Sequence, residues 1–307
     1  MRIGTRRSAL AIAQANLIVE QLRAAGREDC ELVPLLAVGD RADAGVGAND
    51  KSRWVSELER ALAAGEIDLA VHSAKDVPGE LAEGLALHGA PARASAADVL
   101  CGADALDQLP ADARVGTSSV RRLAQLRATR EDLEVVAIRG NVDTRLRKLA
   151  DPDQRLDAIV LAHAGLQRLG LDAAVGGVLD AERFVPAPGQ GVIALEGRDD
   201  DDDAREAVQA ITDKDAFACL LAERALAAEL DASCHTPLGA YAVPAGCGCL
   251  QLRAWVGLPD GSEWVSDQLL GGFYDPEALG RRVGERLQAV GGGELLRRAA
   301  EMAGQRD

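Results

Sequence analysis

The sequence has few aromatic residues and no long apolar run. Only eight of its 307 residues are Phe, Trp or Tyr, which leaves little side-chain surface on which nucleic-acid bases could stack. It lacks any apolar stretch of about 18 residues, the length that indicates a membrane-spanning helix. Basic residues are outnumbered, because 34 Lys and Arg face 49 Asp and Glu, for a formal net charge of −15. Since phosphate contacts dominate nucleic-acid binding, this balance argues against that partner.

Cysteine is scarce, and we find no secretory signal. The first eight residues carry arginines but no apolar core with a cleavage site follows them. We therefore expect a cytoplasmic protein whose thiols are reduced. The length predicts two or three domains, and 48% apolar with 27% charged residues is ordinary globular composition. The six cysteines stand at positions 30, 101, 219, 234, 247 and 249.

Short apolar runs alternate with helical patterns over the first two-thirds of the chain. This alternation predicts an α/β fold with crossover connections and mostly parallel sheets. Two short echoes, Ile3-Gly4-Thr5 with Val115-Gly116-Thr117 and Asp68–Val71 with Asp157–Val160, suggest two related lobes, although such echoes also arise by chance. The pattern predicts strands at 2–4, 30–38, 68–72, 114–117, 134–138 and 158–161, and helices after Ser8 and at 55–64, 120–127, 142–149 and 166–169.

The last third has a different pattern. A helix is predicted at 217–230, followed by a loop that contains Cys234. Strands are predicted at 250–258 and 263–270, and Pro259-Asp260-Gly261 between them is typical of a hairpin turn. With a further helical stretch from Pro276, this region reads as a small α+β domain.

Cations gather in one segment of this acidic chain. Between Arg114 and Lys148 there are nine Lys and Arg against four Asp and Glu. Thr117, Ser119, Arg121 and Arg122 lie where a predicted strand ends and a helix begins, a position that favours anion binding through free N–H groups. Hydroxyl groups and guanidinium forks there suit carboxylates or phosphates. The alternative is a solvated basic helix face paired with the acidic remainder.

Two further positions could carry chemistry. Lys75 and Asp76 directly follow a predicted buried strand, so they could provide an anion-binding cation and an acid or base, or form an ordinary surface pair. Cys234, next to His235 in a polar loop, is either a candidate nucleophile or an unremarkable cysteine. Cys247 and Cys249 are spaced too closely for a usual zinc pair, and we predict no metal site.

Six motifs are spread along the chain, at Arg2–Leu10, Val71–Pro78, Val115–Arg122, Ile138–Leu146, Pro186–Gly191 and Cys234–Gly239. Together they resemble the porphobilinogen deaminase (hydroxymethylbilane synthase) family. They occur in the family's order and spacing, so the resemblance covers nearly the whole chain.

The resemblance implies a fold of three domains. Two interleaved lobes like those of periplasmic binding proteins would comprise residues 1–93 with 190–212 and residues 94–189, and residues 213–307 would form the cofactor-attachment domain. It also implies a dipyrromethane cofactor joined by a thioether to Cys234. Four porphobilinogen molecules would be condensed head to tail with loss of ammonia, and a linear tetrapyrrole would be released. The family suggests a monomer.

The resemblance also implies roles for single residues. Asp76 would be the catalytic carboxylate, which hydrogen-bonds pyrrole N–H groups and stabilises positive charge formed during coupling. Lys51 and Trp54 would belong to a lid. The cofactor's acid groups would be held by Lys75, Thr117, Ser119, Arg121, Arg122 and Arg145, and those of the incoming pyrrole by Arg6, Ser8, Arg139 and Arg168.

The chain departs from the family pattern in two places. A glycine-rich lid motif is here Asp50-Lys51-Ser52-Arg53-Trp54, and the residues before Cys234 are Asp231-Ala232-Ser233 where the family usually has Glu-Gly-Gly. Lost glycines remove backbone freedom. The competing hypothesis is therefore a catalytically impaired two-lobed protein of the same fold that binds carboxylates.

Overall fold

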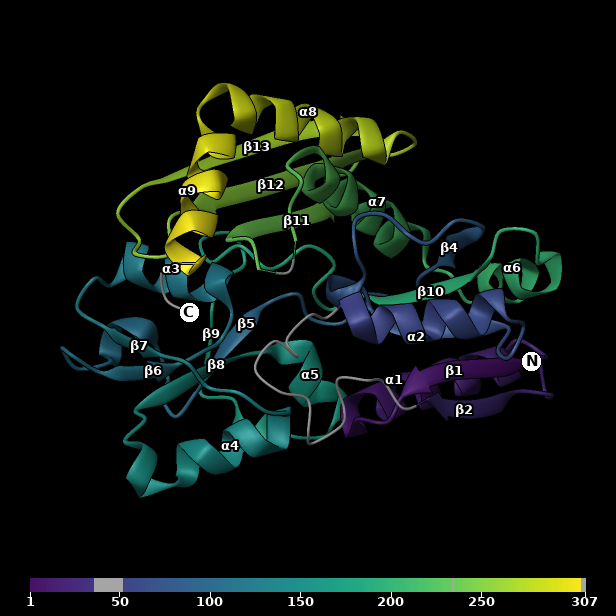
Figure 1. Cartoon of the computed structure of the whole chain (residues 1–307), viewed down its shortest axis with the longest axis horizontal. Helices are drawn as coiled ribbons and strands as arrows, with labels where there is room; N and C mark the ends of the chain where they lie inside the picture. The colour runs from purple at the N-terminus through teal and green to yellow at the C-terminus, as the bar shows by residue number, and fades with distance from the viewer. Residues whose placement is uncertain (36–51, 234, 305–307) are drawn as a thin grey trace. The chain divides into compact units, whose positions relative to one another are not determined.

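The computed structural model describes residues 1–35, 52–233 and 235–304, with the backbone alone at 52–54 and 304. The chain divides into two compact units, residues 1–94 with 192–217 and residues 95–191 with 218–307. Three crossings, at 94/95, 191/192 and 217/218, therefore interleave the units along the sequence. Figure 1 shows the elements in chain order. No helix in the described part of the chain has the length and apolarity needed to span a membrane.

The first unit is built on a five-stranded sheet of order β2-β1-β3-β10-β4. β1 is parallel to β2 and β3, while β10 is antiparallel to both of its neighbours. One face is covered by α1, whose Ile18 and Leu22 are fully buried, and the other by α2 through Leu58 and Leu62. The strands are β1 (Arg2–Arg6), β2 (Glu31–Leu35), β3 (Leu69–Ser73), β4 (Leu85–Gly89) and β10 (Ile193–Arg198), and the helices are α1 (Ala9–Ala24), α2 (Ser52–Ala63) and α6 (Asp202–Gln209).

The second unit contains another five-stranded sheet, of order β7-β6-β8-β5-β9. Here β6 is parallel to β7 and β8, and β5 is antiparallel to both of its neighbours. Leu126 of α3 packs on one face, and Leu166 of α5 packs on the other. The strands are β5 (Asp98–Cys101), β6 (Arg114–Gly116), β7 (Glu134–Val136), β8 (Ala158–Ala162) and β9 (Gly177–Val178), and the helices are α3 (Val120–Thr129), α4 (Val142–Ala150) and α5 (His163–Arg168).

The two sheets repeat one architecture. In each sheet the second strand in the spatial order has parallel neighbours on both sides, and the fourth strand is reversed. A matching contact occurs in both, because the Arg2 N–H donates to Asp68 Oδ2 and the Arg114 N–H donates to Asp157 Oδ2, each at 2.7 Å. The short sequence echoes lie at these equivalent strands. They therefore mark related lobes rather than chance similarity.

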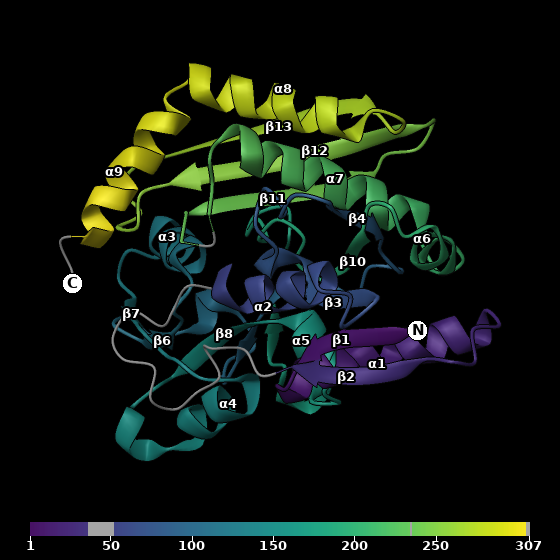
Figure 2. The ribbon, with the colours of Figure 1, turned by 45° about the vertical axis from the view of Figure 1, so that its right-hand side comes forward.

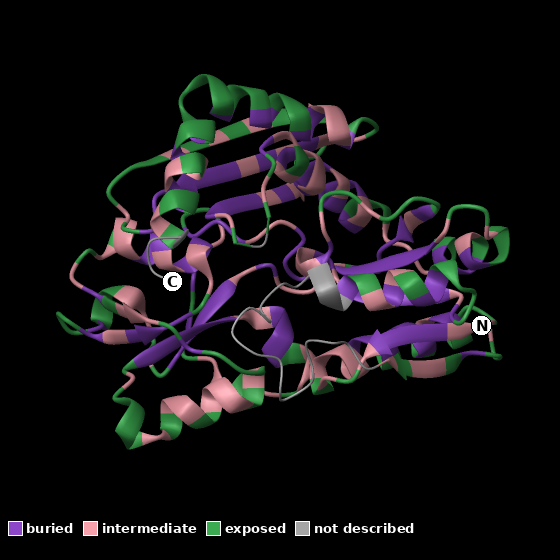
Figure 3. Ribbon diagram, viewed as in Figure 1, coloured by how far each residue is buried: buried purple, intermediate pink, exposed green. Residues whose placement is uncertain are grey.

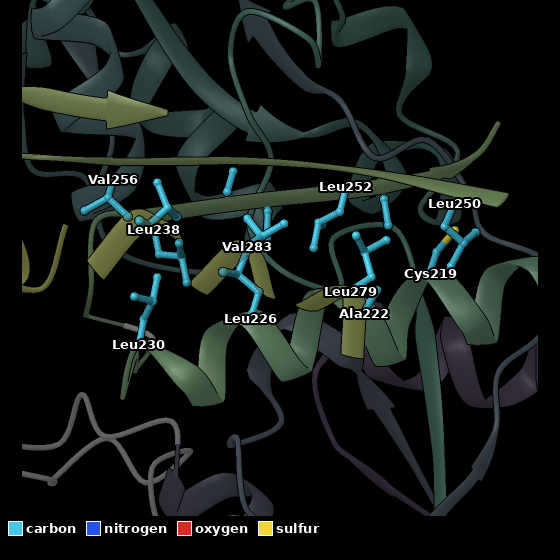
Figure 4. Close-up of a cluster of buried hydrophobic side chains, with 14 of the residues drawn as sticks. Cys219, Ala222, Leu226, Leu230, Leu238, Leu250, Leu252, Val256, Leu279 and Val283 are labelled. Carbon is cyan, nitrogen blue, oxygen red and sulfur yellow. The ribbon is translucent and has the colours of Figure 1, made fainter. Parts of the chain in front are cut away.

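The second unit also contains a three-stranded antiparallel sheet, β11-β12-β13. Figure 2 shows α8 and α9 along this sheet, where they contact β13 and β12. Leu226, Leu252 and Val283 belong to the apolar core between the sheet and its helices, drawn in Figure 4. On the opposite face, Trp255 packs against Ala124 of α3. The elements are α7 (Lys214–Glu229), β11 (Leu238–Pro244), β12 (Cys249–Gly257), β13 (Trp264–Gly272), α8 (Pro276–Ala289) and α9 (Gly292–Gly304).

The predicted fold class is confirmed, since both large sheets have four strands in one direction and one reversed, and a small α+β region follows. Figure 3 shows the expected burial, with strands largely buried and outer helix faces exposed. Several element bounds differ from the prediction; for example, α5 begins at His163, before the predicted 166, and β7 ends at Val136, before the predicted 138. The three-domain boundaries remain a prediction.

Candidate functional site

The first predicted group lies at one edge of the first sheet. Because β1 and β3 are parallel neighbours, their carboxyl ends meet at the same edge. Arg6 ends β1, and Ser8 caps α1 by accepting a hydrogen bond from the Ala11 N–H at 3.3 Å. Lys75 and Asp76 follow β3 in a short 3₁₀ turn, η2 (Ala74–Asp76). The order of the strands thus brings four predicted site residues to one sheet edge.

The turn that carries Asp76 is tied to the strands around it. The Ala74 N–H donates to the Val192 carbonyl at 3.0 Å, just before β10. Ser73, the last residue of β3, exchanges hydrogen bonds of 2.9 and 3.0 Å with the buried Gln14 side chain of α1. Lys75 and Asp76 are themselves half-buried. The backbone that carries the Asp76 carboxylate is therefore fixed by hydrogen bonds to neighbouring elements.

The second predicted group lies at the equivalent edge of the other lobe. Thr117 directly follows β6, and Ser119 caps α3 by accepting from the Arg122 N–H at 3.4 Å. The Ser119 N–H donates to Thr117 Oγ1 at 3.2 Å, so the two hydroxyl groups share one turn. The predicted hydroxyl pair is therefore placed at a helix N-terminus.

Arg121 and Arg122 do not project from a solvated helix face. Both are buried, with 3% and 5% exposure, and both donate to the carboxylate of Asp98 at 2.7 Å. Each also donates to a backbone carbonyl at 2.8 Å, Arg121 to Val185 and Arg122 to Val160. The alternative of a solvated basic face is wrong for this pair. Their predicted contact with cofactor acid groups remains a prediction.

Arg139, Arg145 and Arg168 follow β7 and β8 at the same edge. Arg139 is exposed, and its carbonyl accepts from Lys148 at 3.1 Å. Arg145 Nε donates to the Gly140 carbonyl at 2.8 Å, and Arg168 donates to the Gly191 carbonyl at 2.7 Å. Burial lowers the pKa of Arg168 to about 10, and burial together with the charge of Arg122 lowers the pKa of Arg145. Both side chains are half-buried, which accounts for the lowered pKa values.

Asp98 was missed by the sequence reasoning. Its carboxylate is fully buried, and burial alone would raise its pKa, but the charges of Arg121 and Arg122 reverse the effect and lower the pKa to about 2. A signal exists in the sequence, since Asp98 interrupts the apolar stretch Ala96–Cys101. An acid in a buried strand requires a cationic or hydrogen-bonding partner.

The Val185–Gly191 segment was recognised only as a family motif. Gln125 accepts from the Val185 N–H at 2.7 Å, and the fully buried Glu223 accepts from the Gly189 N–H at 2.6 Å. Gln190 donates to the Ala96 carbonyl and to Asp98 at 2.7 and 2.9 Å. Gly189 and Gly191 adopt φ of 71° and 87°, which favour glycine. The segment is thus held closely beside the cationic group.

Three predicted positions cannot be placed. Cys234 and Lys51 lie outside the described residues, and so does the side chain of Trp54, whose backbone belongs to α2. The described cysteines are free, and Cys247 is exposed. The attachment and lid assignments therefore stay predictions.

Comparison with known proteins identifies the family. Residues 1–206 match the family model "Porphobilinogen deaminase, dipyromethane cofactor binding domain", and residues 217–289 match the "Porphobilinogen deaminase, C-terminal domain" model. The curated porphobilinogen deaminase of Xanthomonas euvesicatoria is 44% identical, over 96% of this chain and 98% of that one. Those of Brevibacillus brevis and Pelotomaculum thermopropionicum are 40% and 42% identical, over 96% and 97% of this chain and 96% of each relative. The chain therefore belongs to the porphobilinogen deaminase family of transferases, which act in tetrapyrrole biosynthesis and carry a dipyrromethane cofactor.

Proposed function

We propose that this chain condenses four porphobilinogen molecules head to tail into hydroxymethylbilane, with release of ammonia, on a dipyrromethane cofactor joined to Cys234. Family membership supports the reaction. The cationic edge of the second lobe supports the ligand, because dipyrromethane and porphobilinogen carry acetate and propionate groups. The competing hypothesis of an impaired carboxylate-binding protein is not favoured by relatives that match over nearly the whole chain.

The observation that carries the proposal is the state of Arg145 and Arg168. Both arginines are half-buried, and within the described residues each donates to a backbone carbonyl and has no carboxylate partner. Buried charges in proteins are normally paired. The residues present therefore fit a ligand that brings its own carboxylates.

Binding is divided between the two sheet edges in this proposal. Lys75, Thr117, Ser119, Arg121, Arg122 and Arg145 hold the acid groups of the cofactor. Arg6, Ser8, Arg139 and Arg168 hold those of the incoming porphobilinogen. Charge-assisted hydrogen bonds of this kind contribute roughly 1.5–3 kcal/mol each. When bound, the cofactor supplies the pyrrole carbon to which the first substrate is joined.

Asp76 supplies the catalytic charge. Its carboxylate accepts hydrogen bonds from pyrrole N–H groups and stabilises the positive charge that develops as ammonia leaves. The braced η2 turn keeps this carboxylate in one position, which limits the reorganisation needed during the reaction. Lys51 and Trp54 are proposed as lid residues that exclude water.

The proposal also covers the location, the oligomeric state and the domain division of the protein. We propose that the protein is a cytoplasmic monomer with three domains, at residues 1–93 with 190–212, 94–189 and 213–307. The crossings at 94/95 and 191/192 support the interleaving of the first two domains. Sedimentation of the purified protein tests the monomer directly.

Intact mass spectrometry tests the central claim. Protein purified from a host that makes porphobilinogen should carry the added mass of two pyrrole units, and fragmentation should place it on Cys234. The matched control is Cys234→Ala, which should have the mass of the bare chain. A wild-type protein with an unmodified thiol and no turnover of porphobilinogen would favour the carboxylate-binding alternative.

A further inference from the structure

Asp98 is the centre of a buried polar cluster to which the proposed mechanism assigns no role. It begins β5 and is fully buried. Its Oδ1 accepts from Arg122 Nε and a terminal Arg122 nitrogen at 3.0 and 2.7 Å, and its Oδ2 accepts from Arg121 at 2.7 Å. Gln190 adds a further donor to Oδ1 at 2.9 Å. One carboxylate therefore fixes two consecutive arginines and the Gln190 side chain.

The cluster keeps a positive charge after these pairs are made. One carboxylate faces two guanidinium groups, and Arg145 lies close enough for the charge of Arg122 to lower its pKa. The pKa of Arg121 is also lowered, by burial and by the positive charge of Arg122, although the negative charge of Asp98 acts in the opposite direction. An ordinary structural ion pair would be neutral. This cluster has one carboxylate for two guanidinium groups and so carries a net positive charge.

The two arginines also keep unused donors. A guanidinium has five N–H groups. In the described contacts Arg121 uses two of them, toward Asp98 and Val185, and its buried Nε–H has no hydrogen-bond partner. Arg122 uses three, toward Asp98 and Val160. Donors therefore remain on both side chains while their positions are already set.

We propose that Asp98 is a positioning residue for cofactor loading: it orients Arg121 and Arg122 so that their remaining donors meet the carboxylates of dipyrromethane. This inference rests on the proposed function, which gives those arginines their ligand. It predicts that the position of the carboxylate matters, beyond its charge. A purely structural Asp98 would affect loading only through the stability of the fold.

The experiment measures loading separately from stability. Cofactor-free protein is mixed with porphobilinogen, and intact mass spectrometry follows the gain of two pyrrole units over time. Wild type, Asp98→Asn and Leu126→Ala are compared, each at a temperature equally far below its own melting midpoint. Leu126→Ala is the matched control, because Leu126 is fully buried on the same helix α3 and its truncation opens a cavity in the apolar core without removing a hydrogen bond of the cluster.

We expect Asp98→Asn to load about tenfold more slowly than wild type, in line with the effect of outer-shell partners in metal sites. Leu126→Ala should load at the wild-type rate. Equal rates for Asp98→Asn and wild type would overturn the inference and leave the proposed function intact. Failure of wild type itself to gain the mass would instead overturn the proposed function.

If Asp98→Asn does not accumulate as folded protein, a second variant tests the positioning role of Asp98. Asp98→Glu keeps the charge and moves the carboxylate by one methylene group. Slower loading at matched stability supports positioning, because the charge of the cluster is unchanged. Loading at the wild-type rate would show that charge alone suffices, and the inference would be wrong.

Discussion

Arg168 tests whether the protein keeps a partly buried cation unpaired, at a cost in stability, so that a ligand carboxylate can pair with it. It ends α5, and burial alone lowers its pKa from 12.5 to about 10. At about 1.4 kcal/mol for each pKa unit, keeping this side chain charged costs about 3 kcal/mol of folding free energy at neutral pH. Its hydrogen bond to the Gly191 carbonyl returns about half of that. Arg168→Gln, which removes the charge and keeps an N–H donor, should therefore stabilise cofactor-free protein by about 1–2 kcal/mol.

The measurement is a thermal melt in a Cys234→Ala background, so that no chain carries the cofactor. A gain of this size corresponds to a rise of a few degrees, about 2–4 °C for each kcal/mol in a chain of a few hundred residues. Arg168→Lys is the control, because it keeps a cation at the same position and should give no gain. The KM for porphobilinogen should rise in Arg168→Gln measured on the loaded enzyme.

Two results would refute this reasoning. A melting temperature for Arg168→Gln below that of its parent would show that the buried charge is already compensated within the protein. An equal gain in Arg168→Lys would show that side-chain shape, rather than charge, sets the stability. Either outcome would also remove the main support for an acidic ligand at this edge.

Three further predictions concern other parts of the chain. Asp76→Asn should keep the cofactor mass in the intact protein but lower turnover by about 10²-fold or more, because the charge that stabilises developing cations is lost; undiminished turnover would exclude Asp76 as the catalytic carboxylate. The pKa of Asp98 is about 2 in the fold against an ordinary 3.8, so its contribution to folding stability is complete above pH 3.8 and is lost as the pH falls through 2. The difference in the free energy of unfolding between wild type and Asp98→Asn, measured by urea unfolding, should therefore shrink by about 1 kcal/mol from about pH 6 to about pH 3. A constant difference would contradict the lowered pKa of Asp98. Gly280→Ala would place a methyl group 2.3 Å from the Ala222 carbonyl oxygen and should destabilise the protein by about 1–3 kcal/mol. The control Gly293→Ala, where a methyl group would have nothing within 4 Å, should be neutral or stabilising by up to about 1 kcal/mol. Equal melting temperatures for the two variants would show that α7 and α8 tolerate wider spacing.

The sequence was sufficient to place several of the predicted site residues at the ends of strands. Thr117, Arg145 and Arg168 were assigned to strand-to-helix junctions or to family motifs, and the structure sets all three after neighbouring parallel strands. The placement could be predicted because parallel strands have their carboxyl ends at one edge of the sheet. Residues that follow different strands in the sequence are therefore expected to lie near one another in space. Ser8 and Ser119 likewise occupy the cap positions that a serine before a helical pattern predicts.

The strands that interleave the lobes were not predicted. β5 and β10 each contain a buried acid, Asp98 and Glu196, within an otherwise apolar stretch. Such residues weaken a strand pattern, and their partners are far away in the sequence, since Glu196 lies 2.8 Å from His72 and Asp98 pairs with Arg121. Pairing between distant strands leaves no local signal. The resemblance to the family supplied the interleaving that periodicity could not.

The charge arrangement links stability to function. A chain with a net charge of −15 has ample acid to neutralise its arginines, yet the described carboxylates leave Arg145 and Arg168 unpaired and share one Asp98 between two other guanidiniums. Compensation from within the protein would stabilise the empty fold, but it would also compete with the carboxylates of the ligand for the same donors. A covalently attached ligand stays on the unfolded chain, but its carboxylates can contact these guanidinium groups only in the folded state, and such contacts would stabilise that state. In the proposed function, the acid groups of the attached cofactor supply this missing charge, and loading should therefore raise the stability of the second lobe more than it would if Arg145 and Arg168 were already paired within the protein.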